Sequence, residues 1–253
     1  MGMEENTKSI VNNAIMAENT LKKLFEDWDG DEKIFRSLIH LRPTTSGVTV
    51  VSTVPGFHMR GLNMNKADEL EEILTKLKNL LCTNDKRSLL EKLKFDQKES
   101  RSKNELEEDV QAFLIRDMII NPSKYHEIQF VASEFDLLEM EPRRKRADVI
   151  GYKDSVLYDI ELKRERLTEV VTQARKYTDF LSDNIQEYEK RLAAFPYSVI
   201  EKVNEVKGIA LMPKSTGKIW ADKVNGWKEK HIDLWYYEGD NDKGFSIDIN
   251  PAI

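Results

Sequence analysis

Residues 143–177 read RRKRADVIGYKDSVLYDIELKRERLTEVVTQARKY, and this stretch decides the fold class that we predict. Within it, Ala147–Tyr152 and Val156–Lys163 are rich in β-branched and aromatic residues, as strands are. The polar segment 153–155, Lys-Asp-Ser, separates them and is typical of a turn. The stretch therefore predicts an antiparallel β-hairpin.

The register of this hairpin brings two carboxylates together. If Asp154 and Ser155 are the two loop residues, counting outward places Asp148 opposite Glu161 on the same sheet face. Directly opposed residues have Cβ atoms about 4.5–5.5 Å apart, so the two carboxylates would repel each other unless a cation lay between them. Strand alternation places Lys163 on this face as well.

These residue types point to metal-assisted chemistry on a phosphate. Carboxylate oxygens with no His or Cys nearby favour Mg²⁺ or Mn²⁺ over zinc. A lysine ammonium beside them can orient a water or stabilise charge that develops on a phosphate, so we expect phosphodiester hydrolysis. The alternative is that Asp148 and Glu161 belong to a solvated hairpin face and pair with Lys and Arg side chains.

A helix is predicted before the first strand, in the segment NELEEDVQAFLIRDMII that begins at Asn104. Its apolar face is formed by Val110, Phe113, Leu114 and Met118. Glu107 lies nearer to this face than Glu108, so we expect Glu107 to complete the acidic site. Alternatively, Asn104 and Glu107 have the spacing of a capping box, in which Glu107 would bind backbone amides.

The stretch resembles the PD-(D/E)xK nuclease superfamily through Ala147-Asp148 on one strand and Glu161-Leu162-Lys163 on the next. Ala147 stands where the family usually has proline. Gln173 and Tyr177 match the Gln-x-x-x-Tyr helix motif of the RecB-like and Cas4-like branches, and the layout also resembles archaeal mismatch endonucleases and Shedu-type defence nucleases. The resemblance covers about residues 104 to 215.

The resemblance implies a restriction-endonuclease-like α/β fold, with a central mixed sheet flanked by helices. It implies that Asp148 and Glu161, helped by Glu107, hold Mg²⁺ or Mn²⁺ and that Lys163 is the catalytic lysine. DNA is expected as substrate rather than RNA, and endonuclease action rather than exonuclease action. A role in phage defence or DNA repair rests on the resemblance alone.

The helix motif has two interpretations. By resemblance, Gln173 and Tyr177 would position the nucleic acid or support the site. Tyr177 also belongs to an apolar stripe that marks the buried face of one long helix, formed by Val170, Ala174, Tyr177, Leu181, Ile185, Tyr188 and Leu192. Gln173 lies at the margin of this stripe, from which it could reach the end of the sheet near Lys163.

Positive charge brackets the predicted site, although the chain as a whole is acidic. Its 39 Lys and Arg against 45 Asp and Glu give a formal net charge of -6, so affinity for nucleic acid must come from local patches. Arg143, Arg144 and Arg146 precede the first carboxylate and Arg164 follows Lys163. We expect these four to contact a phosphate backbone, although such a run can also be a merely solvated face.

Composition predicts a folded cytoplasmic protein. An apolar content of 40% supports a packed core, and there is no apolar run of the ~18 residues that a membrane helix needs. The start of the chain lacks the apolar core of a signal peptide, so no membrane association is expected. Cys82 is the single cysteine, which excludes an intramolecular disulfide.

We predict two domains, a smaller N-terminal α+β domain over residues 1–98 and a nuclease-like domain over residues 99–253. Expected elements of the first are a helix at 8–27, strands at 34–41 and 48–54, and a helix at 65–81; strands at 207–212 and 232–237 would continue the second. The N-terminal domain could bind nucleic acid, form a homo-oligomer or respond to a regulatory ligand or partner. Trp220, Trp227 and Trp235 suit packing better than base stacking.

These expectations combine into a metal-dependent deoxyribonuclease. The alternative is a nucleic-acid-binding or assembly module that keeps the nuclease fold but is silent, or that needs a partner or ligand for activation.

Overall fold

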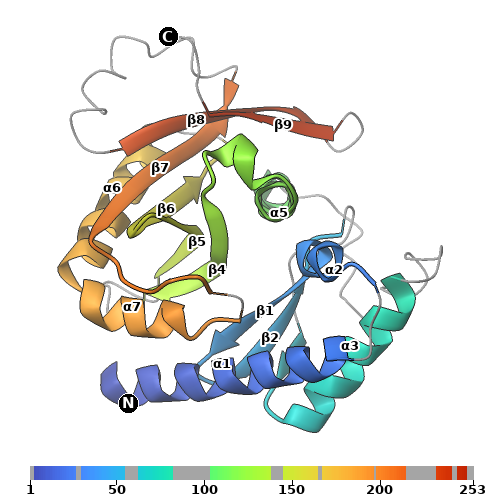
Figure 1. Ribbon diagram of the computed structural model, residues 1–253. Helices are drawn as coiled ribbons and strands as arrows, with labels where there is room; N and C mark the ends of the chain where they lie inside the picture. Colours follow the sequence, from blue (N-terminus) through green and yellow to red (C-terminus); the bar gives the residue numbers. More distant parts are fainter. Residues whose placement is uncertain are drawn as a thin grey trace.

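The structure is a computed structural model, and it describes residues 3–26, 30–54, 62–81, 103–137, 145–164, 167–196, 198–214, 232–240 and 244–249. It contains a six-stranded mixed sheet and a three-stranded antiparallel sheet, each with helices packed on it (Figure 1). This confirms an α/β chain with a larger mixed sheet and a smaller N-terminal sheet. No helix in the described part of the chain is long and apolar enough to cross a membrane.

The larger sheet has the strand order β4-β5-β6-β7-β8-β9. Its strands are β4 (Gln129–Leu137), β5 (Lys145–Lys153), β6 (Val156–Leu162), β7 (Glu205–Pro213), β8 (Ile232–Asp240) and β9 (Gly244–Asp248). The pairs β6–β7 and β7–β8 are parallel and the others are antiparallel. The predicted hairpin is confirmed, because Lys153 pairs with Val156 across Asp154 and Ser155, whose φ angles of 49° and 66° suit a two-residue type I′ turn.

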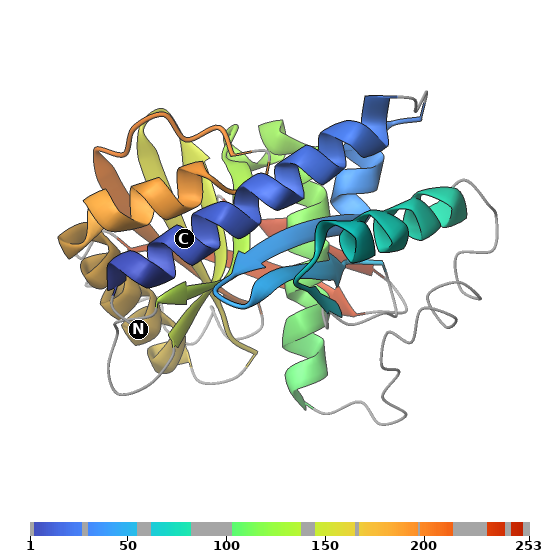
Figure 2. The ribbon, with the colours of Figure 1, turned by 90° about the horizontal axis from the view of Figure 1, so that it is seen from below.

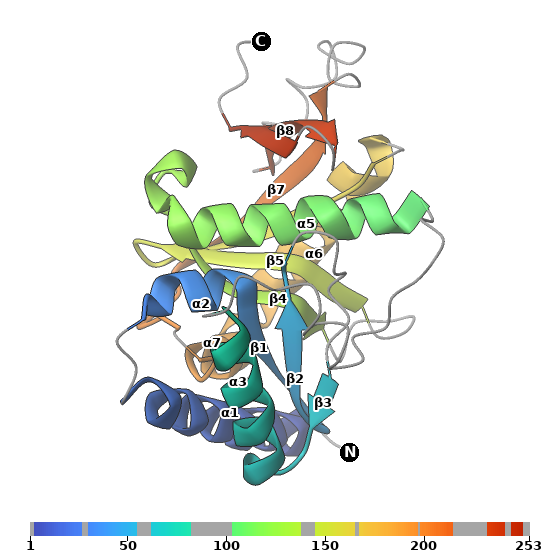
Figure 3. The same ribbon diagram turned by 90° about the vertical axis from the view of Figure 1, so that its right-hand side faces the viewer.

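Helices cover both faces of this sheet. Helix α5 (Lys103–Ile120) crosses one face, and a one-turn 3₁₀ helix, η1 (Pro122–Tyr125), follows it (Figure 3). Helices α6 (Leu167–Asp183) and α7 (Ile185–Ala193) pack on the other face. Gly208 on β7 allows α6 to lie close, because a Cβ at this position would lie 2.6 Å from the Thr178 hydroxyl and would also collide with Ile232.

The N-terminal unit, residues 3–81 as described, has its own core. It contains α1 (Met3–Glu26), α2 (Glu32–Leu38), β1 (Ile39–Thr44), β2 (Gly47–Ser52), β3 (Leu62–Met64) and α3 (Ala67–Leu81). Apolar side chains of these elements, such as Leu21, Phe35 and Leu74, form one buried cluster. The segment that would join this unit to α5 lies outside the described residues, and so does the expected boundary between residues 98 and 99.

The N-terminal unit packs on the larger sheet along three lines of contact. Helix α1 runs alongside α7 (Figure 2), α2 contacts α5, and β1 contacts β4. At the last of these contacts His40 Nε2 lies 2.8 Å from the Ser133 hydroxyl. Arg116 of α5 also donates to the carbonyl of Thr53. The N-terminal unit therefore packs against β4, the strand next to β5, which carries Asp148.

Several boundaries differ from those predicted. The strand expected at 34–41 is wrong in its first part, because the Asp31 side chain caps α2 by accepting from Ile34 N–H at 3.2 Å, and the strand begins at Ile39. The long helix expected through residue 192 is interrupted at Asn184, whose side chain donates to the Phe180 carbonyl at 2.8 Å. Strand β4 was not predicted.

The other expected elements are present with small shifts. The helices expected at 8–27 and 65–81 correspond to α1 and α3, and the strand expected at 48–54 corresponds to β2. Strands β7 and β8 extend the segments expected at 207–212 and 232–237. Trp235 is buried in the core as expected, whereas Trp220, Trp227 and Cys82 lie outside the described residues.

Candidate active site

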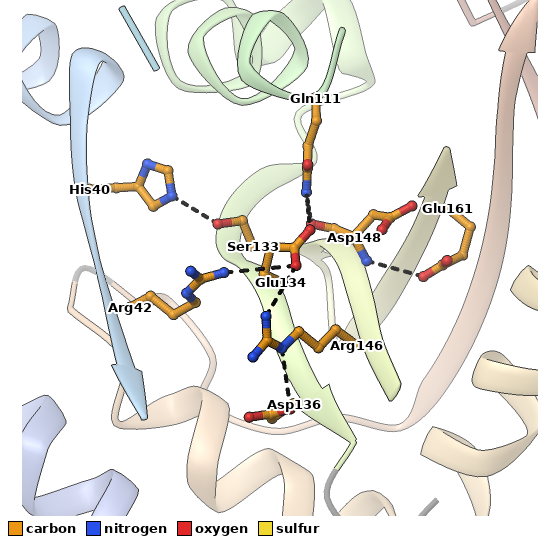
Figure 4. Close-up of polar contacts among 9 residues, drawn as sticks. All are labelled: His40, Arg42, Gln111, Ser133, Glu134, Asp136, Arg146, Asp148 and Glu161. Atoms are coloured by element: carbon orange, nitrogen blue, oxygen red, sulfur yellow. Dashed lines mark hydrogen bonds and ion pairs between the residues drawn. The ribbon is translucent and has the colours of Figure 1, made fainter. Parts of the chain in front are cut away.

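Asp148 and Glu161 meet where the β5–β6 hairpin opens. The ladder runs from Lys153–Val156 to Val149–Ile160, and beyond it side chains replace backbone partners. Asp148 N–H donates to Glu161 Oε1 at 3.1 Å, and Leu162 N–H donates to Asp148 Oδ2 at 2.8 Å. Figure 4 shows the two side chains converging from adjacent strands. The predicted convergence of these carboxylates is therefore present.

Lys163 and Glu107 join them from the end of β6 and from α5. Lys163 Nζ lies 3.4 Å from Glu107 Oε2, and the backbone N–H of Arg164 donates to Glu107 Oε1 at 3.0 Å. The alternative of a capping box depends on the Asn104 side chain, which lies outside what the structure describes; the contacts shown for Glu107 are those to Lys163 and to the Arg164 N–H. Burial opposes the charge of Lys163, but Asp148, Glu107 and Glu161 outweigh it and raise the Lys163 pKa.

Gln173 reaches the site, as its position at the margin of the helix stripe predicted. Its side-chain amide donates to Glu161 Oε2, so both oxygens of the fully buried Glu161 carboxyl have partners. Tyr177 is 5% exposed and packs in an apolar cluster with Leu181 and Tyr188. The geometry gives Gln173 a role in holding Glu161 and Tyr177 a place in the core, while contact of either with nucleic acid stays a prediction.

Asp159 is a buried acid that the sequence reasoning missed. It lies two residues before Glu161 on β6 and is fully buried. The Thr178 hydroxyl lies 3.5 Å from Asp159 Oδ2, whereas Oδ1 has no hydrogen-bond partner among the described residues. Strand alternation was the available signal, because Asp159 has the same parity as Glu161 and Lys163.

Burial disfavours the charged form of Asp148, Glu161 and Asp159. It raises the pKa of Asp148 to about 7, although Lys163 and the Leu162 N–H oppose the shift. It also raises the pKa of Glu161 and of Asp159 well above their ordinary values, and for Glu161 the neighbouring Asp148 and Asp159 carboxyls raise it further. The site thus gathers carboxyls whose charged forms are disfavoured by burial, and for Asp148 the neighbouring Lys163 offsets that effect only in part.

Gln111 and Glu134 lie beside Asp148 and were not predicted. The Gln111 amide donates to the Asp148 carbonyl at 2.6 Å and lies 3.3 Å from Glu134 Oε1 (Figure 4). Gln111 follows Glu107 by one helical turn, which was a usable signal. Glu134 lies opposite Asp148 on β4 with a φ of 49°, a left-handed backbone that nothing in the local sequence indicates.

Of the four arginines predicted to surround the site, the structure describes Arg146 and Arg164. Arg143 and Arg144 lie outside the described residues. Arg146 is 47% exposed on its side chain and faces Glu134 at 3.6 Å and Asp136 at 3.4 Å. Arg164 is half-buried and its backbone binds Glu107. Acidic neighbours therefore compensate part of the positive charge at Arg146.

These side chains suit a small hard cation that keeps some of its water ligands better than a metal ion held by protein ligands alone. In the described part of the chain, no group of three or more His, Cys, Asp or Glu side chains is arranged to hold a metal ion. Mg²⁺, however, is commonly held by one or two carboxylates and completed by waters and substrate phosphates. Asp148 and Glu161 match that requirement, because they are adjacent and burial disfavours the charged form of both carboxyls.

A scan of the chain against protein-family models, a search of curated proteins and a search of solved structures each found no match. The function has to be argued from the site itself.

Proposed function

We propose that the protein is a metal-dependent nuclease that hydrolyses phosphodiester bonds, with DNA as its substrate. The observation that carries the proposal is the meeting of Asp148, Glu161 and Lys163 at the open end of the β5–β6 hairpin, with Glu107 against the lysine. Two carboxylates and an ammonium, in this order on adjacent strands, suit the hydrolysis of a phosphate ester.

Each side chain has a distinct task in this proposal. Asp148 and Glu161 would hold Mg²⁺ or Mn²⁺, which when bound supplies an activated water and neutralises charge on the scissile phosphate. Lys163 keeps its proton, since neighbouring acids raise its pKa, and can therefore offer positive charge to the phosphate. Glu107 orients the Lys163 ammonium, and Gln173 fixes one oxygen of Glu161.

The basic residues would bind the nucleic-acid strand. Arg146 and Arg164 flank the carboxylates in the sequence, and Arg143 and Arg144 precede them, so a phosphate backbone would meet positive charge on either side of the site. The preference for DNA over RNA and for endonuclease action comes from the resemblance to the PD-(D/E)xK superfamily.

A second candidate is a nucleic-acid-binding or assembly module that is silent or needs activation by a partner or ligand. One observation favours it: both oxygens of the Glu161 carboxyl are hydrogen-bonded within the protein, and its side chain is 0% exposed. Each oxygen of an ionised carboxylate has two lone pairs, so a cation could bind Glu161 beside these hydrogen bonds, but only if neighbouring side chains move to open the buried carboxyl to it. Activation would then consist of that movement.

The test is cleavage of linear and circular DNA, single- and double-stranded, and of RNA, in Mg²⁺, Mn²⁺ or EDTA. Glu161→Gln and Lys163→Met are compared with wild type and with Glu205→Gln, a partly exposed glutamate at the start of β7. We expect cleavage that needs the metal and falls at least about hundredfold in the first two variants only. Metal-independent cleavage, or wild-type rates in folded Glu161→Gln, would refute the assignment, and binding without cleavage would favour the silent module.

A further inference from the structure

A cleft of about 260 Å³, lined by polar and apolar side chains alike, lies between the N-terminal unit and the start of β5. The turn of the β1–β2 hairpin, residues 44–46, forms one rim together with Thr49 and Asn63. Arg42 enters from β1, and Glu134, Asp136 and Arg146 enter from β4 and β5 (Figure 4). The cleft therefore joins the two units next to the strand that carries Asp148.

One nitrogen of the Arg42 guanidinium, Nη1, has no hydrogen-bond partner in the described part of the chain. Its side chain is only 14% exposed, and Nη1 is buried 4.0 Å from Glu134 Oε2, too far for a hydrogen bond. Burial lowers the pKa of Arg42, and the Glu134 carboxylate only partly opposes the shift. A buried guanidinium with a donor to spare is well suited to an anionic ligand.

Arg146 adds a second guanidinium with weakly engaged donors. Its contacts to Glu134 at 3.6 Å and to Asp136 at 3.4 Å are at or beyond the limit of a good hydrogen bond. The two carboxylates thus keep both arginines in place without saturating them. A phosphate oxygen would have to compete with these carboxylates for the guanidinium groups, and the side chains would have to shift for the buried Arg42 Nη1 to reach it.

Neutral polar groups of the hairpin rim are held in place by hydrogen bonds among themselves. The Asn63 amide donates to the Ser46 carbonyl at 3.5 Å, the Thr49 hydroxyl donates to Asn63 Oδ1 at 3.4 Å, and Asn13 of α1 donates to the Thr44 carbonyl at 2.8 Å. A phosphate at this rim would exchange such internal bonds for its own, since hydroxyl, amide and guanidinium groups are the donors that proteins use on nucleic-acid phosphates.

We propose that this cleft binds a backbone phosphate of the nucleic-acid strand, which gives the N-terminal unit a part in substrate binding. The identity of the ligand rests on the proposed function. A volume of about 260 Å³ is below the ~300–1,000 Å³ of small-molecule pockets, so it suits a phosphate group and not a whole nucleotide. Arg146 lies two residues before Asp148, ~7 Å along the strand, so this phosphate would lie a few nucleotides at most from the scissile one.

The experiment measures binding of a fluorescein-labelled DNA duplex and of a labelled single strand by anisotropy, in EDTA, over a series of salt concentrations. Each phosphate contact contributes about 0.9 to the slope of log K against log salt for duplex DNA and about 0.7 for a single strand. We expect Arg42→Met and Arg146→Met each to lower this slope by about one contact, and Arg42→Lys to retain it. Arg175→Met, a half-exposed arginine on α6, is the matched control and should leave the slope unchanged.

The slope reports the number of phosphate contacts. Circular dichroism and thermal melting check that each variant is folded. If Arg42→Met fails to fold, Arg42→Met/Glu134→Gln, which removes both partners of the ion pair, and Arg146→Met decide the question. Unchanged slopes in the folded variants overturn the proposal, and so does Arg42-dependent binding of AMP or inorganic phosphate without a change in the DNA slope. Binding is measured in EDTA, so this test does not depend on cleavage. If the protein never cuts DNA in Mg²⁺ or Mn²⁺ but shows the change in slope, the nuclease function is refuted and the phosphate-binding cleft is retained.

Discussion

Replacing Asp148 by asparagine should stabilise the metal-free protein at neutral and alkaline pH. Burial raises the Asp148 pKa from 3.8 to about 7, so the native state binds this proton more tightly than the unfolded chain does. Stability is then lost as pH rises from about 4 to about 7, by on the order of 4 kcal/mol at ~1.36 kcal/mol per pKa unit. The neutral amide of asparagine would remove this penalty, but Lys163 would lose an attractive partner, which offsets part of the gain.

The expected net effect is an unfolding free energy about 1–3 kcal/mol higher for Asp148→Asn at pH 8 in EDTA, with the difference vanishing near pH 4. Urea unfolding at both pH values measures it, and a melting temperature higher by ~2–4 °C per kcal/mol provides a check. Asp154→Asn is the control, because Asp154 is 83% exposed in the hairpin turn and should show no pH-dependent difference. A variant less stable than wild type at pH 8, or equally shifted at both pH values, would contradict the buried-charge reasoning.

Two further substitutions test the supports of the site. Gln111→Leu should lower the unfolding free energy by about 1–3 kcal/mol, because the Asp148 carbonyl would lose its 2.6 Å partner; an unchanged urea midpoint would mean that water replaces the amide. Gly208→Ala should destabilise by about 1–3 kcal/mol, because its Cβ would crowd Thr178 and Ile232, and a thermal melt equal to wild type would show that α6 can move away without loss.

The part of the site that could be predicted is the part set by local sequence. The Asp154-Ser155 turn fixes the hairpin register, and strand alternation then determines that Asp148 and Glu161 share a face. Helical periodicity predicted in the same way that Glu107 lies near the apolar face of its helix. In each of these cases a fixed backbone period links the residue to its neighbours, so no knowledge of the rest of the fold is needed.

The part that could not be predicted depends on contacts between distant segments. Glu134 lies beside Asp148 only because an unforeseen strand with a left-handed residue pairs there. Arg42 meets Glu134 only because the N-terminal unit packs against β4. The helix at 32–38 was mistaken for a strand because its apolar residues, Ile34, Phe35 and Leu38, suit either period in so short a segment.

The burial of the acidic side chains at the site bears directly on its proposed chemistry. Glu107, Asp148 and Glu161 surround Lys163, Asp159 adjoins Glu161, and burial holds three of these four acids against ionisation. The Asp148 N–H and the Gln173 amide bind the Glu161 oxygens and the Leu162 N–H binds Asp148 Oδ2, whereas Asp159 Oδ1 has no hydrogen-bond partner among the described residues. Because burial raises the Asp148 pKa to about 7, a divalent ion would have to displace its proton below that pH, so metal binding should strengthen as pH rises through about 7. Under the proposed function, the same burial that disfavours the ionised carboxyls would therefore favour a bound divalent ion, and Glu161, whose Oε2 accepts from the Gln173 amide, is one of its two expected ligands.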